Sequence, residues 1–118
     1  MGMDRRAAIS NAITSAMSRF YGKGPERART YLCDDNVICV LEGGLTASEE
    51  TLLTAGGEDV IRDYRQKFQG VVAAELTRTV AEITNREVLT YHSQILFRPT
   101  RTFEMFVLDR PVEQGEAT

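Results

Sequence analysis

Residues Tyr21 to Glu49 read YGKGPERARTYLCDDNVICVLEGGLTASE, and this stretch decides the fold. Its β-branched and aromatic runs, Arg27–Cys33 and Val37–Glu42, predict two strands. The residues between them, Asp34-Asp35-Asn36, are typical of a tight turn because Asp and Asn tolerate the left-handed backbone region. The stretch therefore predicts an antiparallel hairpin. Its second strand is apolar on both faces, which is typical of a central strand covered on both sides.

Helices are predicted on either side of this hairpin. Residues 4 to 20 have apolar side chains at helical spacing, with Asp4 as N-cap, and Gly22 with Pro25 ends the helix. After the hairpin, Thr46 and Glu49 form a capping-box pattern at the start of a short helix over residues 47 to 54.

A long helix is predicted from Glu58 to Thr84. Gly70 inside it indicates a bend or close packing, because glycine costs about 1 kcal/mol in a helix interior. The apolar positions of this helix recur at helical spacing and form one predicted stripe: Ile61, Tyr64, Phe68, Val71, Val72, Leu76, Val80 and Ile83.

A second hairpin follows the turn at Asn85-Arg86. Its predicted strands are residues 87 to 97 and 102 to 108, joined by a loop at 98 to 101. The element order predicts an α+β fold of two α-β-β halves, with a four-stranded antiparallel sheet and helices packed on one face. We expect a single domain over residues 1–110 and a disordered polar tail over 111–118.

Composition excludes several classes of protein. The chain has 118 residues, of which 42% are hydrophobic and 26% charged, with a net charge of −3 that argues against general nucleic-acid binding. It contains no apolar run of the ~20 residues that a membrane helix needs, and its start does not resemble a signal peptide. We therefore expect a soluble, cytoplasmic protein without direct membrane insertion.

The cysteines and the histidine suggest no metal or catalytic centre. If the hairpin turn has two residues, strand parity places Cys33 and Cys39 on opposite faces, and we expect free thiols. The spacing of Cys and His matches no metal site. His92 and Ser93 are adjacent in a strand and point to opposite faces, so they cannot form a catalytic dyad. We expect His92 to be a partly buried structural residue or a lone polar contact, and we expect no catalytic residues, no metal and no cofactor.

The strongest chemical motif is glycine-rich and basic. Glycine lets backbone N–H groups approach an anion, and cations flank the glycines here. The candidate anion-binding residues are Gly22, Lys23, Gly24, Arg27 and Arg29. The competing interpretation is a helix stop followed by solvated charges, since the motif lacks the Gly-Lys-Ser/Thr of a phosphate-binding loop.

Two motifs carry a resemblance to a known family. Tyr21-Gly-Lys-Gly-Pro25 and Leu41-Glu-Gly-Gly-Leu-Thr-Ala-Ser-Glu49 resemble the MpsC-like family, a small bacterial domain named after a Na+-translocating, membrane-potential-generating system. The resemblance covers about residues 4 to 109 and continues at scattered positions: Thr30, Asp35, Leu52, Arg62, Arg65, Phe68, Val88, Ser93, Ile95 and Phe106-Val-Leu108. The family brings no established catalytic or binding residues.

The resemblance implies a non-enzymatic accessory protein that works with a membrane cation- or bicarbonate-handling system, through a membrane-protein partner. The alternative is a small-anion or nucleotide-binding regulatory domain that uses Lys23, Arg27 and Arg29. An enzyme is disfavoured because the sequence offers no nucleophile–base or metal set.

A homodimer is also predicted. A two-layer monomer leaves one sheet face open, and the long apolar stripe from Ile61 to Ile83 needs more cover than one short helix supplies. Twofold pairing is the commonest way to close such a surface. The sequence leaves open whether the sheet or the long helix forms the interface.

Overall fold

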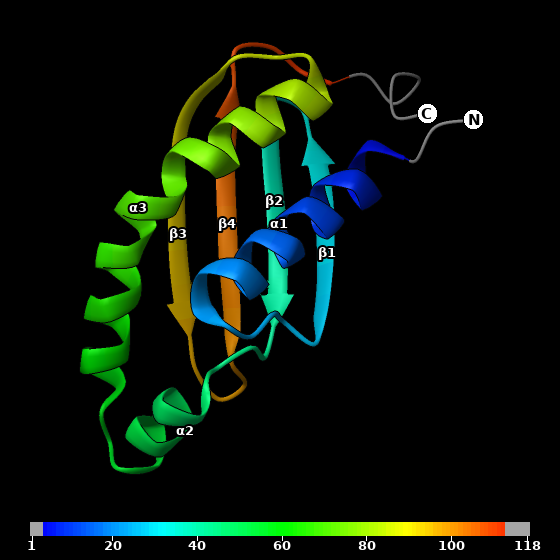
Figure 1. Cartoon of the computed structure of the whole chain (residues 1–118). Coiled ribbons are helices and arrows are strands. Elements are labelled where there is room, and N and C mark those ends of the chain that lie inside the picture. Colours follow the sequence, from blue (N-terminus) through cyan, green and yellow to red (C-terminus); the bar gives the residue numbers. More distant parts are fainter. Residues whose placement is uncertain (1–3, 113–118) are drawn as a thin grey trace.

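The computed structural model describes residues 4–112 and has the predicted α+β architecture. A four-stranded antiparallel sheet has the strand order β1-β2-β4-β3. Figure 1 shows α1 and α3 crossing one face of this sheet, with α2 at one end. The elements are α1 (Arg5–Tyr21), β1 (Arg27–Cys33), β2 (Asn36–Glu42), α2 (Ala47–Thr54), α3 (Glu58–Thr84), β3 (Val88–Leu96) and β4 (Arg101–Leu108).

The predicted helix starts are confirmed by their caps. The side chain of Asp4 accepts a hydrogen bond from the Arg6 N–H, 2.8 Å away, at the start of α1. At α2, the Thr46 hydroxyl accepts from the Glu49 N–H and the Glu49 carboxylate accepts from the Thr46 N–H, which completes the capping box. Local sequence therefore sets both helix starts.

The first hairpin has a tighter turn than predicted. Cys33 pairs with Asn36, so only Asp34 and Asp35 form the turn, and Asp34 has the positive φ of 55°. The two cysteines lie on opposite faces, as predicted, with Cys33 exposed and Cys39 buried, and both are free thiols. Strand β2 is central, because β4 pairs with its other edge.

The main core lies between the sheet and the helices. It joins apolar residues of α1, the middle strands, the second half of α3 and the C-terminal segment: Ile9, Ile13, Ala16, Met17, Val37, Cys39, Leu41, Val72, Leu76, Val80, Phe106, Leu108 and Val112. A smaller cluster of Leu45, Ile61 and Ile95 fixes the first half of α3. Helix α3 is thus anchored separately along its two halves.

Helix α3 has its predicted bounds but not the whole predicted stripe. Figure 1 shows a bend near the middle of this helix. Gly70 lies in the middle of the sequence of α3. A Cβ there would meet no neighbouring atom within 4 Å, so the expectation of close packing at Gly70 is wrong. The expected bend in α3 is present. Tyr64 and Val71 are 48% and 66% exposed, so neither is core. Both positions therefore lie off the buried side of α3.

The helices cover only one face of the sheet, so within the described chain the other side of β2 has no covering layer. On β2, buried Val37, Cys39 and Leu41 alternate with half-buried residues that face away from the helices. On β4, the helix-facing set is Thr102, Glu104, Phe106 and Leu108. His92 is exposed rather than partly buried, because it lies on the open face, paired with Met105.

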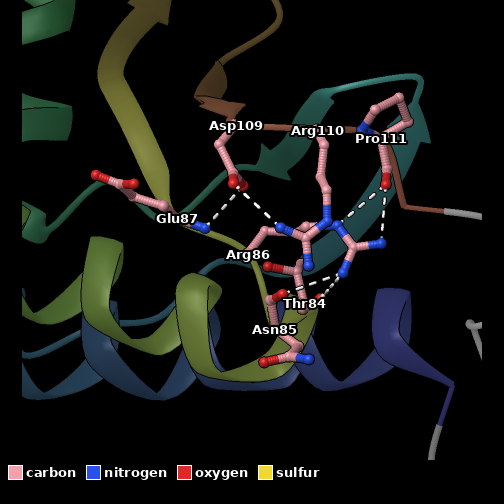
Figure 2. A network of polar contacts seen from close by, with 7 residues as sticks. All are labelled: Thr84, Asn85, Arg86, Glu87, Asp109, Arg110 and Pro111. Atoms are coloured by element: carbon pink, nitrogen blue, oxygen red, sulfur yellow. Dashed lines mark hydrogen bonds and ion pairs between the residues drawn. The ribbon is translucent and has the colours of Figure 1, made fainter.

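Arg86 fastens the C-terminal segment to the end of α3 (Figure 2). Its guanidinium donates to the Pro111 carbonyl at 3.0 and 2.9 Å and to the Asn85 carbonyl at 3.0 Å. The Glu87 N–H donates to the Asp109 carboxylate, 3.0 Å away. The predicted tail begins at Pro111, but Val112 is buried in the core; residues 113–118 of that tail lie outside the described residues.

Among residues 4–112, no helix is both long and apolar enough to cross a membrane.

Candidate functional site

A buried carboxylate lies between the helices and the sheet. Glu104 on β4 is 1% exposed and faces the helix layer. The Tyr91 hydroxyl donates to its Oε1 at 2.5 Å, and the Ser93 hydroxyl donates to its Oε2 at 2.6 Å. Both donors come from β3, whose register with β4 places Ser93 opposite Glu104. Each carboxylate oxygen therefore has a short hydrogen bond from the adjacent strand.

Burial is the largest influence on the pKa values of Glu104 and Tyr91. Loss of solvent raises the pKa of Glu104, although the hydrogen bonds from Ser93 and Tyr91 and the positive charge of Arg65 act in the opposite direction. Burial also raises the pKa of Tyr91, and the neighbouring Glu104 carboxylate adds to that rise. Proton binding at Glu104 is thus favoured relative to an exposed glutamate.

A buried ion pair between Arg65 and Glu49 lies near the Glu104 carboxylate. The Arg65 side chain on α3 donates to the two carboxylate oxygens of Glu49 at 2.7 and 2.6 Å. Its Nη2 also lies 3.4 Å from the Gly44 carbonyl. Burial raises the pKa of Glu49, but the hydrogen bond from Arg65 and the capping bond to Thr46 outweigh it, so the pKa is lowered overall. This pair fixes α2 to α3.

Tyr21 connects this pair to α1. The Arg65 guanidinium carbon lies 3.9 Å from the centroid of the Tyr21 ring, a close cation–π contact. Tyr21 also packs on Phe68, with ring centroids 4.5 Å apart, and on Tyr64 at 6.3 Å. Burial raises the pKa of Tyr21 to about 12. A cavity of about 20 Å³, enough for one water, is lined by Tyr21, Arg65, Tyr91 and Glu104, among others.

The two glycine motifs of the sequence meet at this site. Gly44 has φ of +87°, and a Cβ there would lie 3.1 Å from the Pro25 Cα. A side chain at Gly44 would therefore be strained and would press on the backbone of the other motif. The turn that follows α1 and the segment that precedes α2 are thus packed backbone against backbone.

The predicted anion-binding residues are divided by the sheet. Lys23 lines a small hollow with Gly43, Gly44 and Arg65 on the helix side. Gly22 is the left-handed C-cap of α1, and Gly24 packs on Ser18. Arg27 and Arg29 are exposed and alternate with Ala28 and Thr30, which face α1. The anion site stays a prediction, which phosphate-induced thermal stabilisation, lost in Arg27→Ala with Arg29→Ala, would test.

The buried polar side chains of residues 4–112 are hydrogen-bonded within the domain. No buried side-chain N or O atom there lacks a hydrogen-bond partner. No group of three His, Cys, Asp or Glu in this part of the chain could hold a metal ion. The Glu104 carboxylate accepts hydrogen bonds from Tyr91 and Ser93, and the Glu49 carboxylate accepts from Arg65 and Thr46. The cluster therefore ties α1, α2 and α3 to the sheet.

A groove between α2 and α3 opens to solvent. Its apolar floor includes Leu52, Val60 and Tyr64, which are 36%, 57% and 48% exposed. Between residues 47 and 64 the chain carries five acidic residues and one basic residue. Asp59 and Asp63 are exposed on the same helix as Val60. Asp59 and Asp63 form ion pairs with Arg62 and Lys67. The groove itself is mainly apolar, and its one acidic lining residue, Glu49, is paired with Arg65.

The sequence did not single out Glu104, Tyr91 or the Arg65–Glu49 pair as a site. The alternation in β4 was visible, but Phe103, Met105 and Val107 form the more apolar set and hide the fact that Glu104 faces the core. Arg65 and Glu49 lie on different helices, so helical spacing could not connect them.

Comparison with known proteins identifies the family. The family model described as "Na+-translocating membrane potential-generating system (MpsC)" matches residues 4–110. The chain therefore belongs to the MpsC family, which confirms the resemblance carried by the two glycine motifs. It is also similar to the uncharacterized protein YrhF of Bacillus subtilis (strain 168), with 26% identity over 112 residues and 92% of each chain covered. No solved structure matches significantly.

Proposed function

We propose that the protein is a soluble, non-enzymatic accessory subunit of a membrane system that handles cations or bicarbonate and generates membrane potential. It acts by binding a membrane protein rather than by chemistry of its own. The family description, which names a Na+-translocating membrane potential-generating system, supports the association with such a system.

The observation that carries this proposal is the groove between α2 and α3. Its exposed apolar residues Leu52, Val60 and Tyr64 lie on two helices that are rich in acidic side chains. An apolar groove on such helices fits an amphipathic segment with Lys and Arg on its polar side. Cytoplasmic segments next to membrane helices carry an excess of those residues. The partner segment is therefore a basic, amphipathic segment of a membrane subunit.

The buried cluster supports a scaffolding role for the rest of the domain. Its side chains hydrogen-bond one another, and the capping box and the Arg65–Glu49 pair hold α2 against α3. Because α2 and α3 form the two walls of the groove, this cluster holds the groove open in one shape. A rigid, preformed groove loses less conformational entropy when a partner binds.

Co-purification tests the proposal. The full-length protein, tagged and expressed in its native host, should co-purify from detergent-solubilised membranes with a membrane subunit. Val60→Arg, which places a cation on the groove, should greatly reduce recovery of that subunit. Val71→Arg, on the same helix and 66% exposed in the native chain, is the matched control and should leave recovery unchanged. Equal recovery with all three proteins would contradict the groove as the contact site.

A further inference from the structure

The face of the sheet opposite the helices is apolar at its centre. Every second side chain of each strand lies on this face. Those of β2 and β4 are only half buried within the chain. The central side chains are Ile38, Val40, Phe103, Met105 and Val107. The edge strands are mixed: Tyr31 and Leu96 are 48% and 47% exposed, and the register places Arg29, His92 and Gln94 on the same face. Figure 1 shows no helix on this side of the sheet.

The pattern of β4 indicates that something covers this face. Its helix-facing residues include Thr102 and Glu104, whereas its open-face residues Phe103, Met105 and Val107 are all apolar. The strand is thus more apolar on the side without helices than on the side with them. A sheet whose outer face meets water normally shows polar residues there.

The size of the face suits a second copy of the chain. Four strands spaced about 4.8 Å apart and about eight residues long give a projected area on the order of 500 Å². Because side chains project from the sheet, the accessible area of the face is larger than its projected area and approaches the ~800 Å² per partner of a standard stable interface. A short peptide would leave much of so broad and flat a face uncovered.

Charge selects the symmetry of the pairing. Strand register places Arg27, Glu42 and Arg101 in one row at one end of the face. The opposite end carries Cys33, Asn36 and Thr90, which have no charge that could pair with these arginines. A twofold axis across the strands would set the charged row against this uncharged end. An axis along the strands keeps the charged rows together.

We propose that two copies pair through this sheet face, about a twofold axis that runs along the strands between β2 and β4. Strand β2 then lies on β4 of the partner, and Val40 lies near Phe103 of the partner subunit. Glu42, which is 3.9 Å from Arg101 within its own chain, also faces Arg101 of the partner subunit. Strands in such aligned packings run within about 30° of each other. This pairing does not depend on the proposed membrane partner.

Sedimentation equilibrium of the purified full chain tests the interface. The native protein should be a dimer, and Val40→Arg should weaken association at least tenfold because it buries a cation in the apolar centre. Val71→Arg on α3 is the matched control and should remain dimeric, with circular dichroism verifying that each variant is folded. A native monomer, or a monomer produced by Val71→Arg instead, would overturn the sheet interface.

Charge exchange tests the axis. Glu42→Arg alone and Arg101→Glu alone should each be monomeric, because like charges then face each other in both copies. Mixing the two variants should restore dimers, since each Arg at one position now faces a Glu at the other. A pair within one chain cannot produce this rescue by mixing. If the mixture stays monomeric while Val40→Arg also breaks the native dimer, the proposed axis is wrong.

Discussion

Arg65 on α3 holds the carboxylate of Glu49 on α2 with two hydrogen bonds, 2.7 and 2.6 Å long. Their side chains are 14% and 4% exposed, so the pair is almost fully removed from water. The same guanidinium covers the ring of Tyr21 from α1. One arginine therefore links all three helices, and loss of it leaves a buried carboxylate without its counter-ion.

The first prediction follows from that burial. Arg65→Ala should lower the free energy of unfolding by about 3–5 kcal/mol, because breaking a buried pair strands the remaining charge. Chemical denaturation with urea measures this change. Lys67→Ala is the control: it removes an exposed ion pair with Asp63 and should cost at most about 0.5 kcal/mol. Similar losses in the two variants would contradict the structural role of Arg65.

The capping box gives a second prediction. Thr46→Ala removes the hydroxyl that accepts from the Glu49 N–H, 3.2 Å away, and should cost about 0.5–2 kcal/mol. Thr46→Ser keeps the hydroxyl and should retain most of the stability. An unchanged denaturation midpoint for the alanine variant would show that this bond does not stabilise α2.

The buried Glu104 predicts a pH dependence of stability. Burial raises its pKa above the usual 4.5, so the unfolded state loses this proton at lower pH than the folded state. The stability of the native chain relative to Glu104→Gln should therefore fall as the pH rises from about 4.5 through the folded pKa, and then level off. Unfolding free energies of both proteins between pH 4.5 and 9 measure the difference. A difference that does not change with pH would mean that Glu104 titrates normally.

The two thiols should differ in reactivity. Cys39 is fully buried, and burial raises its pKa to about 11, so little thiolate forms near neutral pH. In a Cys33→Ser variant, a thiol reagent at pH 8 should leave the folded protein unmodified and label one thiol after denaturation. Rapid labelling of the folded variant would contradict the assignment of Cys39 to the helix-covered face.

Local signals in the sequence were sufficient for most of the fold. The cap at Asp4, the box of Thr46 with Glu49, and the Asp34 turn act over a few residues, so the pattern of residues reveals them directly. The face of β4 could not be deduced in this way, because the more apolar of its two alternating sets, Phe103, Met105 and Val107, lies on the side without helices. Only the register with β3 shows that Glu104 meets Tyr91 and Ser93 in the core.

The candidate site depended on long-range placement for the same reason. Arg65 and Glu49 are separated by 16 residues and lie on different helices, and Arg86 reaches the Pro111 carbonyl 25 residues away. Sequence spacing describes neighbours along one helix or strand, not side chains brought together by tertiary packing. The glycines of the two motifs were recognisable, but their mutual contact at Gly44 and Pro25 required the structure.

The molar mass of the unmodified protein tests the central claim that this domain works through its surfaces, with its open sheet face closed by a second copy. Light scattering at micromolar concentration should give about twice the chain mass of 13.2 kDa. A mass of one chain under these conditions would contradict the account, because the apolar face of β2 and β4 would then be stable in water without a partner.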